Sequence, residues 1–208
     1  MIGSLQPRYL NRVYNQTISE ATPSNNHQSL NSNLLWRQMQ EGSQEAFAAL
    51  FKSYYPDLKA YGAKMSGRED LAKEGIQLLF VKIWERKHQL SIAQNPKAYL
   101  LKSYRSILLD LIAKEQKRNR QQTEIALQFS PQEFPFFQNS SSAASSSIHD
   151  FINQLSEKQR EIIYLKFYNN LSYQEIAEVL SINYQTVRNY MVKALTSLRK
   201  KMNFSSKK

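Results

Sequence analysis

The stretch from Ser172 to Lys193, SYQEIAEVLSINYQTVRNYMVK, constrains the fold of this chain more than any other. Ser172 and Glu175 have the spacing of a capping box, in which each side chain accepts a hydrogen bond from the other residue's backbone N–H. Apolar residues then recur at helical spacing, and Asn183 is a good N-cap for a second helix beginning at Tyr184. The stretch therefore predicts two helices joined by a tight turn, a helix-turn-helix.

The second predicted helix has an apolar face and a polar face. The expected core-facing residues are Val187, Met191, Ala194, Leu195 and Leu198. The opposite side carries residue types that hydrogen-bond base edges and phosphates, namely Gln185, Arg188, Asn189 and Lys193. A helical hairpin on any protein surface has the same division into charged and aliphatic sides, so spacing alone leaves that second interpretation open.

The charge of the chain favours the nucleic-acid interpretation. The 208 residues carry a formal net charge of +11, and a basic excess indicates a polyanionic partner. No Asp or Glu follows Glu178, whereas Lys and Arg continue to the end of the sequence.

One residue counts against the helix-turn-helix. Ser181 occupies the turn position that often holds Gly, and a residue other than Gly with a positive φ there is expected to cost about 1 kcal/mol of stability.

The sequence offers no support for an enzyme. It has no cysteine, hence no disulfide framework and no thiolate zinc site, and its three histidines are far apart. Gly62 and Gly67 have the spacing of a phosphate-binding loop but lack the Lys that follows it. We therefore expect no catalytic residue, metal, cofactor or small-molecule substrate. The lack of cysteine fits a reducing cytoplasm, where we expect the protein to be. The sequence also shows no apolar run of a secretory signal and no stretch of about 20 apolar residues that could span a membrane.

Composition along the chain predicts an all-α fold of two small helical domains. Residues 1–30 are polar and are expected to form a disordered arm. Residues 119–147 lose the helical period and contain QNSSSAASSS, which indicates a flexible Ser-rich linker. The expected domains are therefore residues 31–118 and residues 148–208, the second of which contains the helix-turn-helix.

Caps and breakers predict the helices of these domains. A helix beginning near Leu34 should end at Gly42, and the next should run from a Ser43 cap towards Gly62. Two further capping boxes are expected, at Ser66–Glu69 before a helix ending near Lys87, and at Ser156–Gln159. Asn95–Pro96 should start the helix that ends near Lys117.

Two outward faces of the first domain are candidate binding surfaces. One, on the helix ending near Lys87, combines exposed polar and aliphatic residues and suits protein docking: Glu74, Gln77, Leu78 and Val81. The other, on the helix after Asn95, suits a nucleic-acid backbone: Lys97, Lys102, Arg105 and Ser106. An ordinary solvated face explains the first pattern equally well, and lysines that keep a helix soluble could explain the second.

The whole arrangement resembles the extracytoplasmic-function group of bacterial RNA polymerase sigma factors, in the sigma-70 family. GSQEAFAALFKSYYPDL, EGIQLLFVKIWERK and NPKAYLLKSYRSILLDLIAK look like the family's first domain. LSEKQREIIYLKFYNNLSYQEIAEVLSINYQTVRNYMVKALTSLRKKM looks like its second. Together these segments span residues 34 to about 202 apart from the linker. The resemblance implies a DNA-binding subunit that directs RNA polymerase to promoters and initiates transcription.

The resemblance also implies roles for the candidate residues. The β′ clamp helices of the polymerase core would bind Glu74, Gln77, Leu78 and Val81, with Leu78 replacing an acid of the family pattern. The separated −10 strand would contact Asn95, Lys97, Lys102, Arg105 and Ser106, with Ser106 replacing the usual Asn. The −35 element would be read by Tyr184, Gln185, Thr186, Arg188, Asn189 and Lys193. The second domain would rest on the β flap, and a membrane-bound anti-sigma factor would hold the protein inactive.

Two other functions remain compatible with the residues. The chain could be an operator-binding regulator that dimerises through its first domain, using the stripe of Leu78 and Val81. It could also be a helical adaptor whose basic faces meet acidic proteins.

Overall fold

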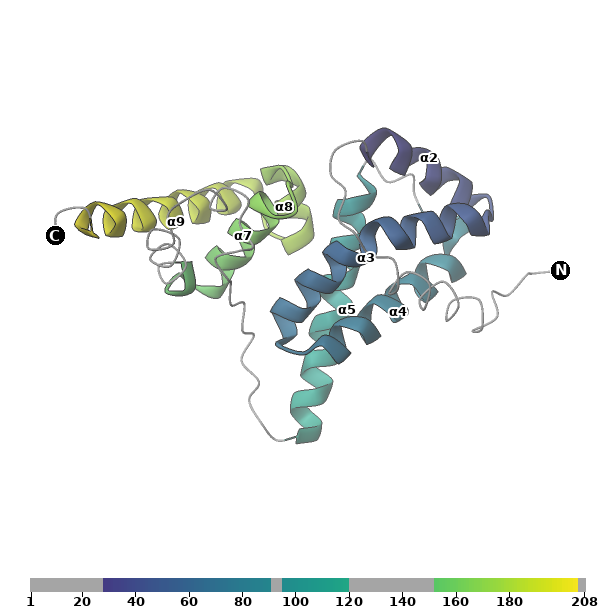
Figure 1. Ribbon diagram of the computed structural model, residues 1–208, viewed down its shortest axis with the longest axis horizontal. Coiled ribbons are helices and arrows are strands. Elements are labelled where there is room, and N and C mark those ends of the chain that lie inside the picture. The colour runs from purple at the N-terminus through teal and green to yellow at the C-terminus, as the bar shows by residue number, and fades with distance from the viewer. Residues whose placement is uncertain (1–27, 91–94, 120–151, 206–208) are drawn as a thin grey trace. The chain divides into compact units, whose positions relative to one another are not determined.

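The computed structural model describes residues 28–90, 95–119 and 152–205, and these residues form helices, turns and short connections without a strand (Figure 1). The helices are α2 (Gln28–Gln40), α3 (Gln44–Ser66), α4 (Glu69–Glu85), η1 (Lys87–Gln89), α5 (Pro96–Asn119), α7 (Glu157–Phe167), α8 (Tyr173–Leu180) and α9 (Tyr184–Ser205). The chain divides into two compact units, with the change near Gln121. The predicted all-α class is confirmed, whereas the predicted arm (1–30) and linker (119–147) lie almost wholly outside the described residues.

The first unit is built around aromatic side chains that α3 and α4 contribute to a shared core. Phe47 of α3 packs edge-to-face against Phe80 and Trp84 of α4, with ring centroids 5.7 and 5.0 Å apart. Phe51, one turn after Phe47, meets the same Phe80 at 4.8 Å. Such pairs contribute about 0.5–1.5 kcal/mol each beyond the area they bury. They fix α3 against α4, and the opposite side of α4 remains exposed.

Tyr104 of α5 locks the three long helices together. Its hydroxyl donates a 2.9 Å hydrogen bond to the carbonyl oxygen of Ala72 on α4. A Cβ added to Gly62 of α3 would lie 1.8 Å from the Tyr104 hydroxyl oxygen, and one added to Gly75 would lie 2.9 Å from the ring. Burial also raises the pKa of Tyr104. Gly62 is therefore a point of close approach inside α3, and the expectation that the helix ends towards Gly62 is wrong.

Two other predicted boundaries differ from the structure. The first described helix begins at Gln28, before the expected start near Leu34. The capping box at Ser66–Glu69 is wrong, because Ser66 is buried as the last residue of α3 and Arg68 precedes α4 without a side-chain cap. Gly67 has φ +66°, the left-handed conformation that ends a helix and that glycine adopts without strain.

The second unit packs α7, α8 and α9 around buried aliphatic residues and the buried Tyr164 of α7. Both predicted capping boxes are present, at Ser156–Gln159 before α7 and at Ser172–Glu175 before α8. The buried residues of the helix-turn-helix include Ile176, Ala177, Leu180, Val187, Met191 and Ala194. The expectation that Leu195 faces the core is wrong, because Leu195 is 43% exposed. Leu198 lies among residues whose side chains are not described.

Candidate functional site

The turn between α8 and α9 has the geometry that the sequence predicts. Ser181 ends α8 in the left-handed conformation, with φ 53° and ψ 44°, and the N–H of Ile182 donates to the Ala177 carbonyl at 3.0 Å. The Asn183 side-chain oxygen accepts a 2.7 Å hydrogen bond from the Thr186 N–H and so caps α9. After this turn α9 packs against α8, and its polar side is exposed.

The exposed side of α9 carries the residues that are candidates for contact with DNA bases. Gln185, Arg188, Asn189 and Lys193 are all exposed. The Gln185 amide donates a 3.1 Å hydrogen bond to the Asn189 side-chain oxygen, which orients two amides one turn apart. Amide groups of this kind can pair in two places with adenine in the major groove. The surface is therefore equipped for direct reading of base pairs.

The two residues at the start of α9 have different settings. Tyr184 is 44% exposed and meets Tyr173 of α8 edge-to-face, with ring centroids 6.3 Å apart. Thr186 is half-buried, and its backbone N–H is taken up by the Asn183 cap. Thr186 thus belongs to the start of the helix, and it is also a candidate for contact with DNA.

Sequence reasoning missed two exposed apolar residues on α9. Val192 is 56% exposed, and Leu195, assigned to the core from its spacing, is 43% exposed. Three of the five large hydrophobic residues exposed in the described parts of the chain lie on α9, the third being Tyr184. The available signal was position: Val192 follows Gln185 by seven residues, two turns along the same side of the helix.

The candidate face on α5 is divided by the structure. Lys102 and Ser106 are exposed and one turn apart, and Arg105 is half-buried beside them. Lys97 does not join them, because its ammonium forms a 2.7 Å ion pair with Asp57 of α3. The exposed Asp110 continues the line of Lys102 and Ser106 by another turn. Since a carboxylate repels phosphate, a nucleic-acid backbone would be held best before Asp110 on this side.

Asn95 has a structural role at the start of α5. Its side-chain oxygen accepts a 3.2 Å hydrogen bond from the Ala98 N–H, as the predicted N-cap requires. Residues 91–94, which precede it, lie outside the described residues. Asn95 therefore fixes the point at which α5 begins, two turns before Lys102.

The candidate docking face on α4 is accessible. Glu74, Gln77 and Leu78 are exposed, with Leu78 at 38%, and Val81 is half-buried. The buried residues of α4, among them Ile76, Leu79 and Phe80, occupy the other side of the helix. An acid, an amide and two aliphatic side chains thus share one surface, with both hydrogen-bonding and apolar contacts available to a partner.

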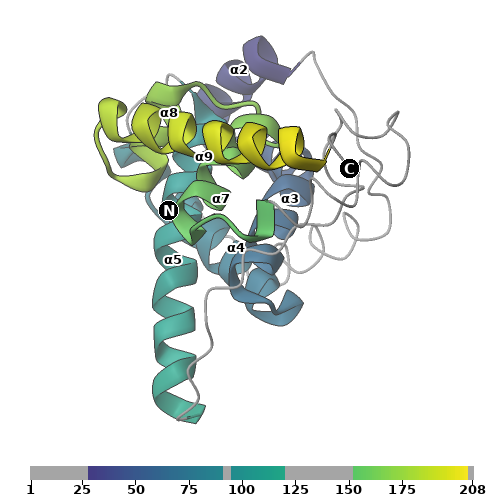
Figure 2. The same cartoon turned by 90° about the vertical axis from the view of Figure 1, so that its left-hand side faces the viewer.

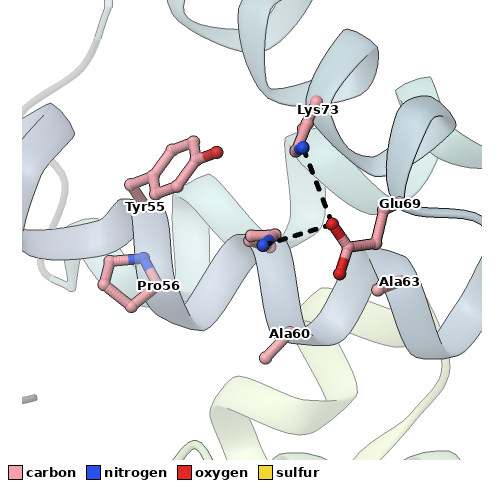
Figure 3. A pocket seen from close by; sticks show the side chains of 7 residues that line it. Tyr55, Pro56, Ala60, Ala63, Glu69 and Lys73 are labelled. Atoms are coloured by element: carbon pink, nitrogen blue, oxygen red, sulfur yellow. Dashed lines mark ion pairs between the residues drawn. The ribbon is translucent and has the colours of Figure 1, made fainter. Parts of the chain in front are cut away.

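A hollow of about 360 Å³ flanks this docking face between α3 and α4 (Figure 3). Its lining residues are Tyr55, Pro56, Lys59, Ala60, Ala63, Glu69 and Lys73. The Glu69 carboxylate lies 3.3 Å from the Lys59 ammonium and 3.6 Å from that of Lys73. The hydrogen bond from Lys59 is the main cause that lowers the pKa of Glu69. Because Glu69 is shared by two lysines, the rim of the hollow keeps a net positive charge.

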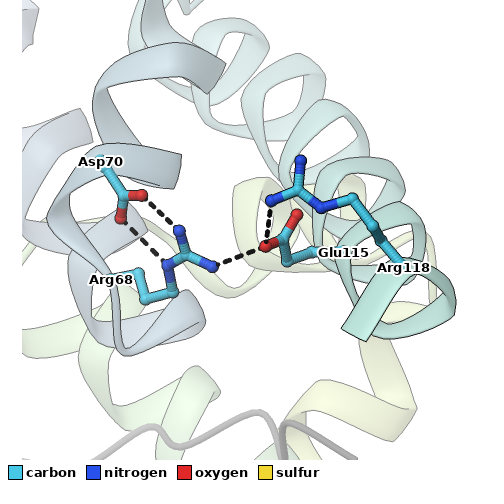
Figure 4. A network of polar contacts seen from close by, with 4 residues as sticks. All are labelled: Arg68, Asp70, Glu115 and Arg118. Carbon is cyan, nitrogen blue, oxygen red and sulfur yellow. Dashed lines mark hydrogen bonds and ion pairs between the residues drawn. The ribbon is translucent and has the colours of Figure 1, made fainter. Parts of the chain in front are cut away.

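A polar network joins the turn before α4 to α5 (Figure 4). Arg68 donates to Asp70 and, at 3.0 Å, to Glu115, which also accepts from Arg118 at 3.0 Å. The bond from Arg68 lowers the pKa of Asp70. Both views of the ribbon show the last turns of α5 projecting beyond the turn between α3 and α4 (Figures 1 and 2). The network therefore holds α5 at the place where it leaves the body of its unit.

The helices described here include none with the length and apolar character that a bilayer crossing requires.

Comparison with known proteins identifies both units. Residues 50–118 match the family model of sigma-70 region 2, and residues 145–198 match that of sigma-70 region 4. The chain is also similar to the ECF RNA polymerase sigma factor SigK of Mycobacterium ulcerans (strain Agy99). The two are 22% identical over 170 residues, which cover 80% of this chain and 91% of the relative.

Solved structures show the same fold. CnrH in complex with the cytosolic domain of CnrY has a TM-score of 0.57 and 18% identity, covering 83% of this chain and 97% of that one. The sigma factor RpoE in complex with the anti-sigma factor NepR from Bartonella quintana has a TM-score of 0.55 and 20% identity, covering 76% and 96%. At these identities the likeness concerns the fold.

Proposed function

The chain belongs to the sigma-70 family as an extracytoplasmic-function sigma factor, and we propose that its two units divide promoter recognition between them. Its function is to direct RNA polymerase to specific promoters and to initiate transcription, and sigma factors are not enzymes. The observation that carries this assignment is the match of two sigma-70 regions, in order, to two compact helical units.

The proposed division follows the faces of the helices. The first domain, residues 31–118, would bind the β′ clamp helices through Glu74, Gln77, Leu78 and Val81. Its α5 would hold the separated −10 strand through Lys102, Arg105 and Ser106. Contacts from Asn95 and Lys97, at the start of the helix, would form beside the Asn95 cap and the ion pair of Lys97 with Asp57. Strand separation needs no covalent chemistry, since preferential binding of unpaired bases is sufficient.

The second domain, residues 148–208, would read the −35 element with α9 and rest on the β flap. Gln185, Arg188 and Asn189 would contact base edges, whereas Lys193 would contact phosphate. Tyr184 and Thr186 would complete the contact at the N-terminal end of α9, which is the part of a recognition helix that usually reaches the bases.

The two domains would be weak separately and effective together. Each offers a few cationic contacts, and linked modules gain through effective concentration once a partner holds both in place. Residues 119–147 would be the tether. Promoter binding would then depend on the polymerase, as suits a subunit that binds and dissociates.

An anti-sigma factor is the proposed regulator, and we place the protein in the cytoplasm with the polymerase. RpoE in the structure named above is bound to an anti-sigma factor, which supports a partner of this class. A membrane-bound anti-sigma factor would keep the chain from the polymerase until a signal releases it.

Run-off transcription tests the assignment. The purified chain, added to core RNA polymerase and genomic DNA, should produce transcripts from discrete start sites that core polymerase alone does not produce. Gel filtration should show a monomer that changes its elution volume with core polymerase. A dimer that binds duplex DNA without polymerase would favour the operator-binding regulator instead.

A further inference from the structure

Val192 is exposed to a degree that the folded unit does not explain. Its side chain is 56% exposed, the largest value among the exposed large hydrophobic residues of the described parts of the chain. Valine is also a weaker helix former than Ala, Lys or Gln, because its branched Cβ restricts rotation in a helix. At this surface position Val costs helix stability and gains little burial. A bound partner would account for its presence.

Val192 lies in the middle of the surface that faces DNA under the proposed function. It follows Asn189 by three residues and Gln185 by seven, and the rise of a helix places Val192 about 10 Å from Gln185 along the axis. That length corresponds to about three base-pair steps of roughly 3.4 Å. If α9 follows the groove, the amides of Gln185 and Asn189 and the methyl groups of Val192 would therefore meet base pairs spread over about three steps.

The major groove contains one apolar feature on its base edges, the C5-methyl group of thymine. A valine in a helix keeps one dominant rotamer, so its two methyl groups form a rigid apolar surface. We propose that Val192 reads the C5-methyl of one thymine in the upstream promoter element and so contributes to promoter specificity. This inference rests on the proposed role of α9 as the reader of that element.

The exposed Leu195 makes a competing explanation testable. Val192 and Leu195 are one turn apart, and two neighbouring apolar side chains could instead contact a protein subunit. The two explanations differ in one respect: only a base contact depends on the presence of a methyl group on the DNA.

Deoxyuridine substitution measures that dependence. Holoenzyme is reconstituted from core polymerase and the full chain, and it is bound to a promoter found by run-off transcription. In a series of promoters, each thymine of the upstream element is replaced singly by deoxyuridine, which lacks the C5-methyl. Competition against a fluorescent promoter duplex gives the relative affinities. The same series is measured with Val192→Ala and with Leu195→Ala as the matched control.

One thymine should be sensitive to this replacement. Loss of one buried methyl should weaken binding by wild-type holoenzyme about fourfold at that position. With Val192→Ala the unsubstituted promoter should already bind more weakly, and the replacement should cause less than about a 1.5-fold further change. Leu195→Ala should keep the wild-type sensitivity. Because Val192 is exposed, the thermal midpoint of the Val192→Ala chain should stay close to that of wild type.

Three results would overturn the inference. Wild-type holoenzyme could bind every substituted promoter equally, or Val192→Ala could retain full sensitivity to the methyl group. Val192→Ala could also weaken assembly with core polymerase without any dependence on the methyl, which would assign the patch to a protein contact. Failure of wild-type holoenzyme to bind any promoter would refute the proposed function together with this inference, whereas binding without methyl dependence refutes the inference alone.

Discussion

Ser181 is a single residue at which the helix-turn-helix is strained. Its φ of 53° lies in the left-handed region, where a side chain with a Cβ is disfavoured by roughly 1–2 kcal/mol. Ser181 is exposed, so a substitution there changes little packing. The strain is thus local, and it can be relieved without altering the surface of α9.

Ser181→Gly is therefore expected to stabilise the second unit by about 1 kcal/mol, since glycine adopts this conformation without a steric penalty. The gain should be partly reduced by the greater freedom of glycine in the unfolded chain. Thermal unfolding followed by circular dichroism measures it, and Ser181→Ala serves as the control because it keeps the Cβ. A lower melting temperature for Ser181→Gly than for Ser181→Ala would contradict this account.

Gly62 is a residue that cannot gain even a methyl group. Gly62→Ala should destabilise the first unit by about 2–4 kcal/mol, because the new Cβ would displace the Tyr104 hydroxyl and break its bond to Ala72. Urea unfolding measures the loss. Adding Tyr104→Phe removes the nearest clashing atom, so the double variant should lose less stability than the sum of the single variants. Strict additivity would show that the two residues are not coupled.

The accuracy of the sequence-based predictions varied with how local each feature is. The caps at Asn95, Ser172 and Asn183 are confirmed because a cap involves residues only three apart in the sequence. Ser66 failed as a cap because it is buried within α3, a tertiary fact that spacing does not contain. Leu195 failed for a related reason. Helical periodicity identifies the apolar side of α9. Only the packed structure shows how far along α9 the neighbouring helices of the unit cover that side.

The close approach at Gly62 had no signal in the sequence. A glycine inside a helix-forming stretch normally indicates an end, and the partner Tyr104 lies on a different helix. The candidate faces were easier to define. Exposure of Glu74, Gln77 and Arg188 follows from the apolar periodicity of their helices, whereas the ion pair of Lys97 with Asp57 depends on how α3 and α5 meet.

At the scale of an element, α4 exposes the proposed docking surface on one side while its other side fills the core. Gln77→Lys places a charge on that exposed side, and it should weaken association with core polymerase severalfold while leaving the domain folded. Gln38→Lys makes the same change on the exposed surface of α2 and is the matched control. Gel filtration or fluorescence anisotropy with labelled chain gives the affinity. Full retention of the complex by Gln77→Lys would place the docking surface elsewhere.

At the scale of the whole molecule, the proposed function combines charge with tethering. A net charge of +11 gives the chain a general attraction to DNA that carries no sequence information. Under the proposed function, selectivity comes from base contacts on α9 and from the spacing that the polymerase imposes on two recognition surfaces. Salt separates the two contributions, because phosphate contacts release counterions and contacts to bases do not.

Two substitutions on α9 should therefore behave differently when holoenzyme binding is measured against salt concentration. Lys193→Ala should weaken all promoters to a similar extent and reduce the slope of log K against log salt by about 1. Arg188→Ala should cost about 1–3 kcal/mol at a promoter that presents its preferred base and less at one that does not. The measurement is competitive binding to matched and mismatched promoters over a series of salt concentrations. An unchanged slope for Lys193→Ala would remove it from the phosphate contacts, and an unchanged promoter preference for Arg188→Ala would remove it from the base readers, which would leave neighbouring residues of the same helix to supply each contact.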